Sequence, residues 1–318
     1  MTMLALVFGL PGLWLAITAF APRRPPEPPA LPPAQIADGR PVRLPRESVG
    51  VRGWRLGCGV VLIAFGVLGG WFLYALGQGF DLKLGRPLRV RGRVRLPRRR
   101  RGSGGDDGTR PRLAGLGLWR RAMLGERWHA AARAEHASIA AFDEIAEQLR
   151  LAGAGSELVE RCRSAARDEA RHASRCYALA RQYSGIAWCA GEMPDRAQAP
   201  NELVTLAAES FVDGCLGEAI SAAIARRGAE LATDPAIASS LAMIAGDEAR
   251  HAELGWAIVD GCIALGGEPA LQAVRDAAGT RPRTASRGPT DVPRRERAAI
   301  TARVHAAARA ELARRWTT

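Results

Sequence analysis

The five-residue sequence Asp-Glu-Ala-Arg-His occurs twice in this chain, as Asp168–His172 and as Asp247–His251. Each copy places a glutamate and a histidine three residues apart, on one face of an α-helix if the segment is helical. A carboxylate and an imidazole one turn apart can bind one metal ion together. The repeat therefore predicts two halves of a metal site, with the ligands Glu169, His172, Glu248 and His251.

One further glutamate precedes each copy of the motif, Glu135 before the first and Glu218 before the second. Four glutamates and two histidines are the ligand set of a dinuclear carboxylate site inside a four-helix bundle. Burying four carboxylates in one small core is very costly unless cations compensate their charge, which two divalent ions would do. A single Glu-x-x-His match is more often a solvated face or a structural ion pair, but two copies with two upstream glutamates favour the metal site.

The hydrophobic pattern around these residues predicts the helices that position them. Apolar residues recur at intervals of three, four and seven around each candidate ligand, which is typical of a buried helical stripe. Gly153–Gly155 and Asp234-Pro235 predict the breaks inside two helical hairpins, and residues 184–200 suit a long crossover between the hairpins. We therefore expect an all-α four-helix bundle over residues 118–265.

With these motifs, residues 118–265 resemble the ferritin-like superfamily of dinuclear iron carboxylate proteins, and the Asp-Glu-x-Arg-His form is similar to that of its bacterial multicomponent monooxygenases and fatty-acyl desaturases. The resemblance implies that Glu135 and Glu218 each bind one ion, that Glu169 and Glu248 bridge the two, and that one histidine caps each ion. It also implies an outer layer of polar residues whose aspartates orient the imidazoles. That outer layer consists of Asp168, Arg171, Asp247 and Arg250.

Other polar and aromatic residues near the motifs are weaker candidates. Glu209 lies nine residues before Glu218, about half a helical circumference away, and is expected to face solvent. Asp213 is interpreted in the same way. Tyr177 and Trp256 each follow a candidate histidine by five residues, and packing is the expected role of both.

The N-terminal part of the chain differs from the bundle in composition. Residues 1–80 contain two uncharged hydrophobic runs, of which 56–80 is long enough to span a bilayer. We predict a transmembrane helical hairpin with a Pro/Arg-rich loop at 23–55, and hence a protein of the inner (cytoplasmic) membrane. The basic cluster after the second run places the metal domain in the cytoplasm by the positive-inside rule.

The flanks carry the strong positive charge of the chain, which is +13 overall. Residues 81–117 are predicted to be a basic flexible linker, and residues 266–318 a basic linker followed by an amphipathic helix. Binding of nucleic acid by these arginines is the less favoured interpretation, because few aromatic residues are interleaved with them. No Cys-x-x-Cys pair is present, which excludes a zinc ribbon or a rubredoxin-type iron site.

The leading functional hypothesis is a membrane-anchored dinuclear iron oxidoreductase that uses dioxygen or peroxide. Mixed nitrogen and oxygen ligands suit iron, with manganese also possible. The expected partners are the membrane, an electron donor and a small-molecule oxidant, and neither the donor nor an oligomeric state can be identified from the sequence. The alternatives are an iron-handling ferroxidase or storage protein and a non-enzymatic scaffold stabilised by metal.

Overall fold

The computed structural model describes residues 86–90, 93–102, 107–193, 202–280 and 289–316. Most of the described chain is helical. The helices are α3 (Leu118–Leu151), α4 (Ser156–Ser184), α5 (Leu203–Glu209), η2 (Ser210–Glu218), α6 (Ala219–Leu231), α7 (Pro235–Gly279) and α8 (Arg294–Arg315). Four short strands accompany them, β1 (Arg89–Val90), β2 (Arg93–Val94), β3 (Arg99–Arg101) and β4 (Trp188–Ala190).

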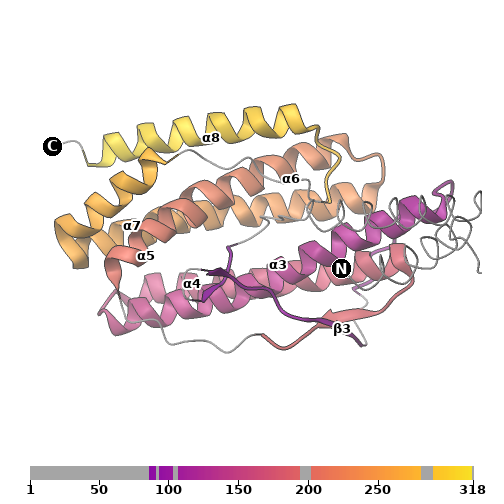
Figure 1. The fold of residues 1–318 in the computed structure, drawn as a ribbon, viewed down its shortest axis with the longest axis horizontal. Helices are drawn as coiled ribbons and strands as arrows, with labels where there is room; N and C mark the ends of the chain where they lie inside the picture. Colours follow the sequence, from indigo (N-terminus) through magenta and orange to yellow (C-terminus); the bar gives the residue numbers. More distant parts are fainter. Residues whose placement is uncertain (1–85, 91–92, 103–106, 194–201, 281–288, 317–318) are drawn as a thin grey trace, which may run out of the picture. The chain divides into compact units, whose positions relative to one another are not determined.

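Two helical pairs form a bundle. Helix α3 packs along α4, and the continuous segment α5–η2–α6 packs along α7 (Figure 1). Helix α8 lies on the outside of the second pair, against α6 and η2. The bundle interior is apolar, and its largest fully buried side chains include Trp128, Phe142 and Phe211.

Helix α3 ends and helix α7 begins near the residues where the sequence predicted breaks. Gly153 has a positive φ of 84° just after α3, a conformation that glycine adopts without the steric cost a Cβ would impose. Helix α7 begins at Pro235, and the side chain of Asp234 accepts a hydrogen bond from the backbone nitrogen of Ala236 at 2.9 Å. Both predicted hairpin breaks are therefore confirmed.

The segment before α3 packs against the bundle. Strands β1 and β2 form a hairpin, and β3 pairs antiparallel with β4, which belongs to the connection after α4. Leu88 is buried against Ala137, Ala140 and Ala141 of α3. These contacts bring the basic residues around position 86 to the side of the bundle.

The structure corrects the predicted fold class in one respect. Within the described residues, none of the helices combines the length and the hydrophobicity that crossing a bilayer requires. The hydrophobic runs of residues 1–80 lie outside the described residues. The described residues therefore do not support the transmembrane hairpin of the predicted fold class, nor the localisation in the inner membrane that was inferred from it.

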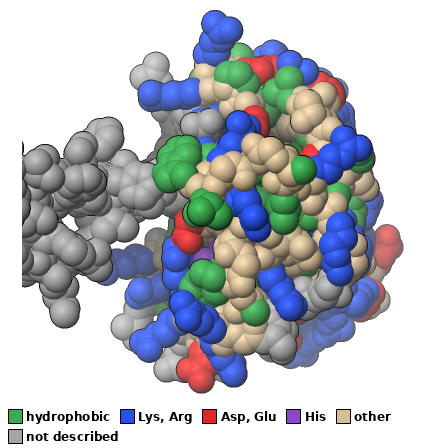
Figure 2. Space-filling model, turned by 90° about the vertical axis from the view of Figure 1, so that its right-hand side faces the viewer, with side chains coloured by type: hydrophobic (Ala, Val, Ile, Leu, Met, Phe, Trp, Pro, Cys, Tyr) green, Lys and Arg blue, Asp and Glu red, His purple; other side chains and the backbone are tan. Residues whose placement is uncertain are grey.

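Basic side chains outnumber acidic ones on the face of the molecule drawn in Figure 2. Many arginines on the described surface are nevertheless paired, as Arg227 is with Glu296 at 2.6 Å and Arg315 with Asp260 at 2.7 Å. Exposed pairs of this kind contribute little to stability. The residues that could do chemistry lie in the interior of the bundle.

Candidate metal centre

The six candidate ligands converge in the middle of the bundle from all four helical segments. Helix α3 supplies one glutamate, η2 supplies one, and α4 and α7 each supply a glutamate and a histidine. Their exposed fractions are 2% or less. The cluster consists of Glu135, Glu169, His172, Glu218, Glu248 and His251.

The cluster contains two sets of four possible ligands. The ligand atoms of each set lie within 4.8 Å of one another. Ligands on opposite sides of an ion with bonds of about 2.1 Å are about 4.2 Å apart, so each set closes around an ion with small inward shifts. Glu169 and Glu248 belong to both sets. Glu135 and His172 complete the first set, and Glu218 and His251 complete the second.

The polar atoms that face one another inside the cluster have no hydrogen-bond partners among the described residues. Both carboxylate oxygens of every glutamate in the cluster, and the Nδ1 atoms of both histidines, are buried without a partner. Leaving one buried polar group unsatisfied costs about 1–3 kcal/mol, and more if the group is charged. Cations would satisfy all ten atoms at once, so this buried cluster could hold metal.

The two copies of the repeated motif hold each other's histidines. The Nε2 atom of His172 lies 2.9 Å from Asp247 Oδ2, and that of His251 lies 3.3 Å from Asp168 Oδ2. These contacts leave each Nδ1 atom facing the carboxylates. The Nδ1 of His251, for example, is 3.3 Å from Glu169 Oε1. A histidine held through one ring nitrogen presents the other in a fixed direction, as metal-ligating histidines do.

The two arginines of the motif complete a polar ring around the aspartates. Arg171 donates to Asp168 at 2.5 Å and lies 3.6 Å from Asp247. Arg250 donates to Asp247 and lies 3.5 Å from Asp168. Each aspartate thus contacts one histidine and two arginines, so the outer residues chosen from the sequence do surround the imidazoles.

The pKa values of the four glutamates of the cluster are not all shifted in the same direction. Burial, reinforced by the charge of Glu169, raises the pKa of Glu135 well above its usual value. Burial and the charge of Glu218 raise the pKa of Glu248 well above the usual value, and burial also raises the pKa of Glu218. All three carboxyl groups therefore hold their protons to a higher pH than an ordinary glutamate does.

Glu169 behaves differently because it lies between the two imidazoles. Burial acts to raise its pKa, but His172 and His251 outweigh burial and lower the pKa to about 2. Burial conversely acts to lower the pKa of His172, but Asp247 and Glu169 raise it to about 10. A cation bound to the Nδ1 atom of either histidine would replace the imidazole proton there. Glu169 would then contact the cation instead of that proton.

The π-helix η2 sets the position of Glu218, its last residue. A π-helix has hydrogen bonds from residue i to i+5, so its turns are wider than those of an α-helix and its faces do not follow the 3.6-residue period. It also approaches α7 closely, because a Cβ on Gly255 would lie 2.7 Å from the backbone nitrogen of Cys215. The widened turn and the close approach together bring Glu218 to the motif of α7.

The prediction that Asp213 faces solvent was wrong. Asp213 is only 3% exposed and accepts two hydrogen bonds from Arg89, at 2.8 and 3.0 Å. The prediction assumed an α-helical period for a segment that is a π-helix. The partner, Arg89, comes from β1, far away in the sequence, and no local pattern pointed to it.

His129 is a second buried residue that the sequence did not single out. It is 0% exposed, and its ring stacks on Trp188 with centroids 4.5 Å apart. Burial and the charges of Arg99 and Arg133 lower its pKa to about 4. Packing on Trp188 is the role that these contacts show for it.

Comparisons of this chain with protein-family models, with curated proteins and with solved structures give no match. We therefore infer the function of this chain from the geometry of its buried cluster.

Proposed function

We propose that this chain is a dinuclear iron protein that activates dioxygen or peroxide. The observation that supports the proposal most strongly is the set of ten buried ligand atoms, enclosed by four helical segments, that form no hydrogen bond within the described part of the chain. Two overlapping sets that share Glu169 and Glu248 suit two ions bridged by those carboxylates. The resemblance of the motifs to dinuclear iron carboxylate proteins points to the same arrangement.

The donor set suits iron, and it suits manganese as well. Four carboxylates and two imidazoles form a mixed oxygen and nitrogen environment, which suits iron or manganese better than metals that prefer thiolates. The described cysteines are free, and none of them belongs to either ligand set. Four carboxylates also balance the four positive charges of two divalent ions, so the filled centre would carry little net charge.

The ions would supply the electrons that reduce the bound oxidant, and an external donor would restore them. The protein contributes the surroundings of that chemistry. Glu135, Glu169 and Glu218 are 0% exposed, which excludes bulk water from the centre. The cross-pairing of Asp168 and Asp247 with the imidazoles keeps both Nδ1 atoms directed inward. The sequence and the contacts identify no electron donor.

The test uses the purified full chain loaded with ferrous ion and then mixed with dioxygen. We expect about two irons per chain and a new near-ultraviolet absorption band after oxidation. Glu169→Gln should abolish both, because it removes a carboxylate common to the two sets. Glu160→Gln is the matched control, since Glu160 lies on the same helix with 56% of its side chain exposed.

Two other results would redirect the assignment. Saturable oxidation of many ferrous ions per chain would favour an iron-oxidising or storage role. A well-folded protein that binds only zinc, or that binds iron but never reacts with dioxygen or peroxide, would contradict the oxidoreductase proposal and favour a metal-stabilised scaffold.

A further inference from the structure

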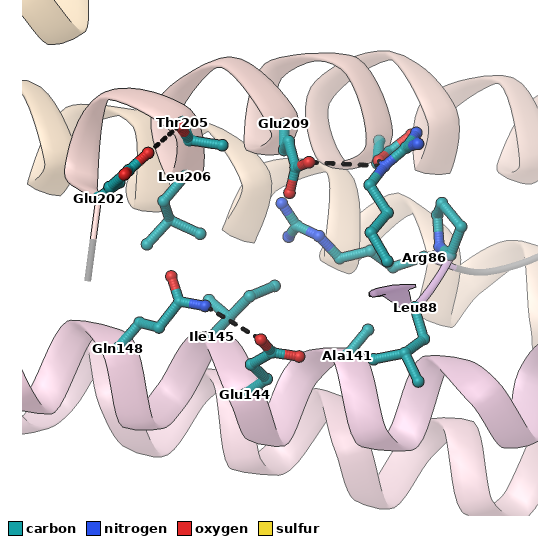
Figure 3. A pocket seen from close by; sticks show the side chains of 13 residues that line it. Arg86, Leu88, Ala141, Glu144, Ile145, Gln148, Glu202, Thr205, Leu206 and Glu209 are labelled. Atoms are coloured by element: carbon teal, nitrogen blue, oxygen red, sulfur yellow. Dashed lines mark hydrogen bonds and ion pairs between the residues drawn. The ribbon is translucent and has the colours of Figure 1, made fainter. Parts of the chain in front are cut away.

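A pocket of about 170 Å³ opens between α3 and the α5–η2 segment. Figure 3 shows its two walls, with Ala141, Ile145 and Gln148 on one side and Leu206 and Glu209 on the other. The volume corresponds to about six water molecules at roughly 30 Å³ each. The pocket therefore has room for one small organic molecule.

Arg86 lines this pocket with a buried and unpartnered charge. The residue is 3% exposed, and neither terminal nitrogen of its guanidinium has a hydrogen-bond partner in the part of the chain that the structure describes. Its Cζ atom lies 5.7 Å from the centroid of the Phe142 ring. A guanidinium keeps its proton in proteins, so this one is a buried cation with unused donors. Such a group requires an acceptor.

The guanidinium lies close to the candidate metal centre. Phe142 separates the two, because its ring also packs edge-on against His251 with centroids 5.2 Å apart. A Cβ built on Gly214 of η2 would lie 3.3 and 3.5 Å from the terminal nitrogens of Arg86. The ring of Phe142 thus contacts both Arg86, at one end of the pocket, and the candidate ligand His251.

Three acidic residues of the pocket contact residues other than Arg86. Asp213 is engaged by both donors of Arg89. Glu144 accepts from Gln148 Nε2 at 3.4 Å, and Glu202 accepts from the hydroxyl of Thr205 at 3.0 Å.

Glu209 is the remaining acidic residue of the pocket wall. It lies 3.8 Å from Arg89 Nε and forms no ion pair with Arg86 among the described contacts. Burial raises the pKa of Glu209, while the charges of Arg89 and Arg86 act to lower it. The pocket thus contains a fixed cation at one end.

We propose that this pocket binds a small organic acid through its carboxylate, with Arg86 as the carboxylate-binding residue. The planar guanidinium can donate two parallel hydrogen bonds to a carboxylate, which is its strongest mode of recognition. The carbon chain of the acid would pack against Ile145 and Leu206. Only one part rests on the proposed function, namely that this acid is the substrate class of the metal centre.

The test measures binding by calorimetry to the full chain, both metal-free and loaded with redox-inert zinc. The probes are butyrate, the neutral isostere butyramide and the cation butylammonium. We expect butyrate to bind at least about tenfold more tightly than the other two. Arg86→Met should remove that preference in both forms of the protein, and Arg93→Met, which changes an exposed arginine of β2, should leave it intact.

Several results would overturn the inference. Equal affinity of the wild-type protein for butyrate and butyramide would do so without any variant. Tighter binding of butylammonium would show a cation site instead. Butyrate binding that survives Arg86→Met in the metal-free protein would show that another group binds the carboxylate. Butyrate binding that appears only with zinc would mean that the metal binds the carboxylate directly.

The outcome is separable from that of the proposed function, because iron content and reaction with dioxygen are measured independently. A protein that holds no iron but binds butyrate through Arg86 would support the carboxylate site and contradict the dinuclear iron function. A protein that holds two irons but does not discriminate butyrate from butyramide would contradict the carboxylate site alone.

Discussion

The two aspartates of the repeated motif each hold the imidazole of the opposite copy. Asp247 contacts His172, and Asp168 contacts His251, so each half of the cluster is oriented by the other half. This reciprocal arrangement explains why the motif contains an aspartate directly before the glutamate. Neither aspartate belongs to the two sets of possible ligands, yet each fixes the direction in which a possible ligand points.

Replacing one of these aspartates should weaken metal binding without unfolding the bundle. Asp247→Asn keeps the size of the side chain but removes the charge that raises the pKa of His172. We expect the affinity for a divalent metal to fall by about 10- to 100-fold, measured by competition with a chelator. Asp143→Asn, on the exposed face of α3, is the control. Equal affinities of the two variants would show that the contact has no orienting role.

The six cluster residues could be chosen from the sequence because their signal is local and repeated. Spacing within the motif and the surrounding apolar stripe are both properties of a short segment, and the structure brings these residues together. Their role as metal ligands stays a prediction. Asp213 and Arg86 could not be found in this way, since one depends on a π-helical turn and the other on packing between distant segments.

At the scale of elements, the contact between η2 and α7 determines how close Glu218 comes to Glu248. The two backbones meet at Gly214 and Gly255, where an added Cβ on Gly255 would lie 2.7 Å from the nitrogen of Cys215. Backbone atoms cannot move aside as a flexible side chain can. The glycine at 255 is therefore required by packing.

Two glycine-to-alanine substitutions on α7 should have opposite effects on stability. Gly255→Ala should lower the free energy of unfolding by about 1–3 kcal/mol through overpacking, and should reduce metal affinity by separating η2 from α7. Gly246→Ala should raise it by about 0.5–1 kcal/mol, because nothing lies within 4 Å of its Cβ position and alanine is the better helix former. Denaturant unfolding measures both, and a tolerated Gly255→Ala would contradict the close approach.

At the scale of the whole molecule, the free energy of unfolding of the metal-free protein should depend on pH. Burial raises the pKa values of Glu135, Glu218 and Glu248, and His172 has a pKa raised to about 10. The folded metal-free protein thus holds protons that the unfolded chain releases above about pH 4.5 and 6.5. Because the native state binds more protons, its stability should fall as pH rises from about 5 to about 9.

Thermal unfolding of the metal-free and zinc-loaded full chain across this range measures the effect. Glu169 and Asp247 have pKa values lowered to about 2, so their contribution changes only at more acid pH. The zinc-loaded protein should show the opposite slope, since metal binding strengthens as its ligands lose protons. A metal-free protein whose stability rises with pH between 5 and 9 would show that the glutamates are not buried together.

The helical bundle as a whole was predictable because its apolar stripes, helix breaks and motif spacings are all encoded locally. The transmembrane hairpin was inferred from hydrophobic runs alone, and no helix of the described residues supports a membrane span. The packing of the two helical pairs against each other was predictable from the candidate metal ligands, because these residues have to meet at one place. Long-range pairings such as β3 with β4 had no signal of that kind.

The most direct test of a dinuclear centre is anomalous X-ray diffraction at the iron absorption edge from crystals of the iron-loaded full chain. The proposed dinuclear iron function predicts two anomalous peaks, about 3.5–4 Å apart as in other two-metal sites, one beside each of the two sets of possible ligands. A single peak, or iron bound only outside the cluster, would contradict the assignment of these six residues as one dinuclear site.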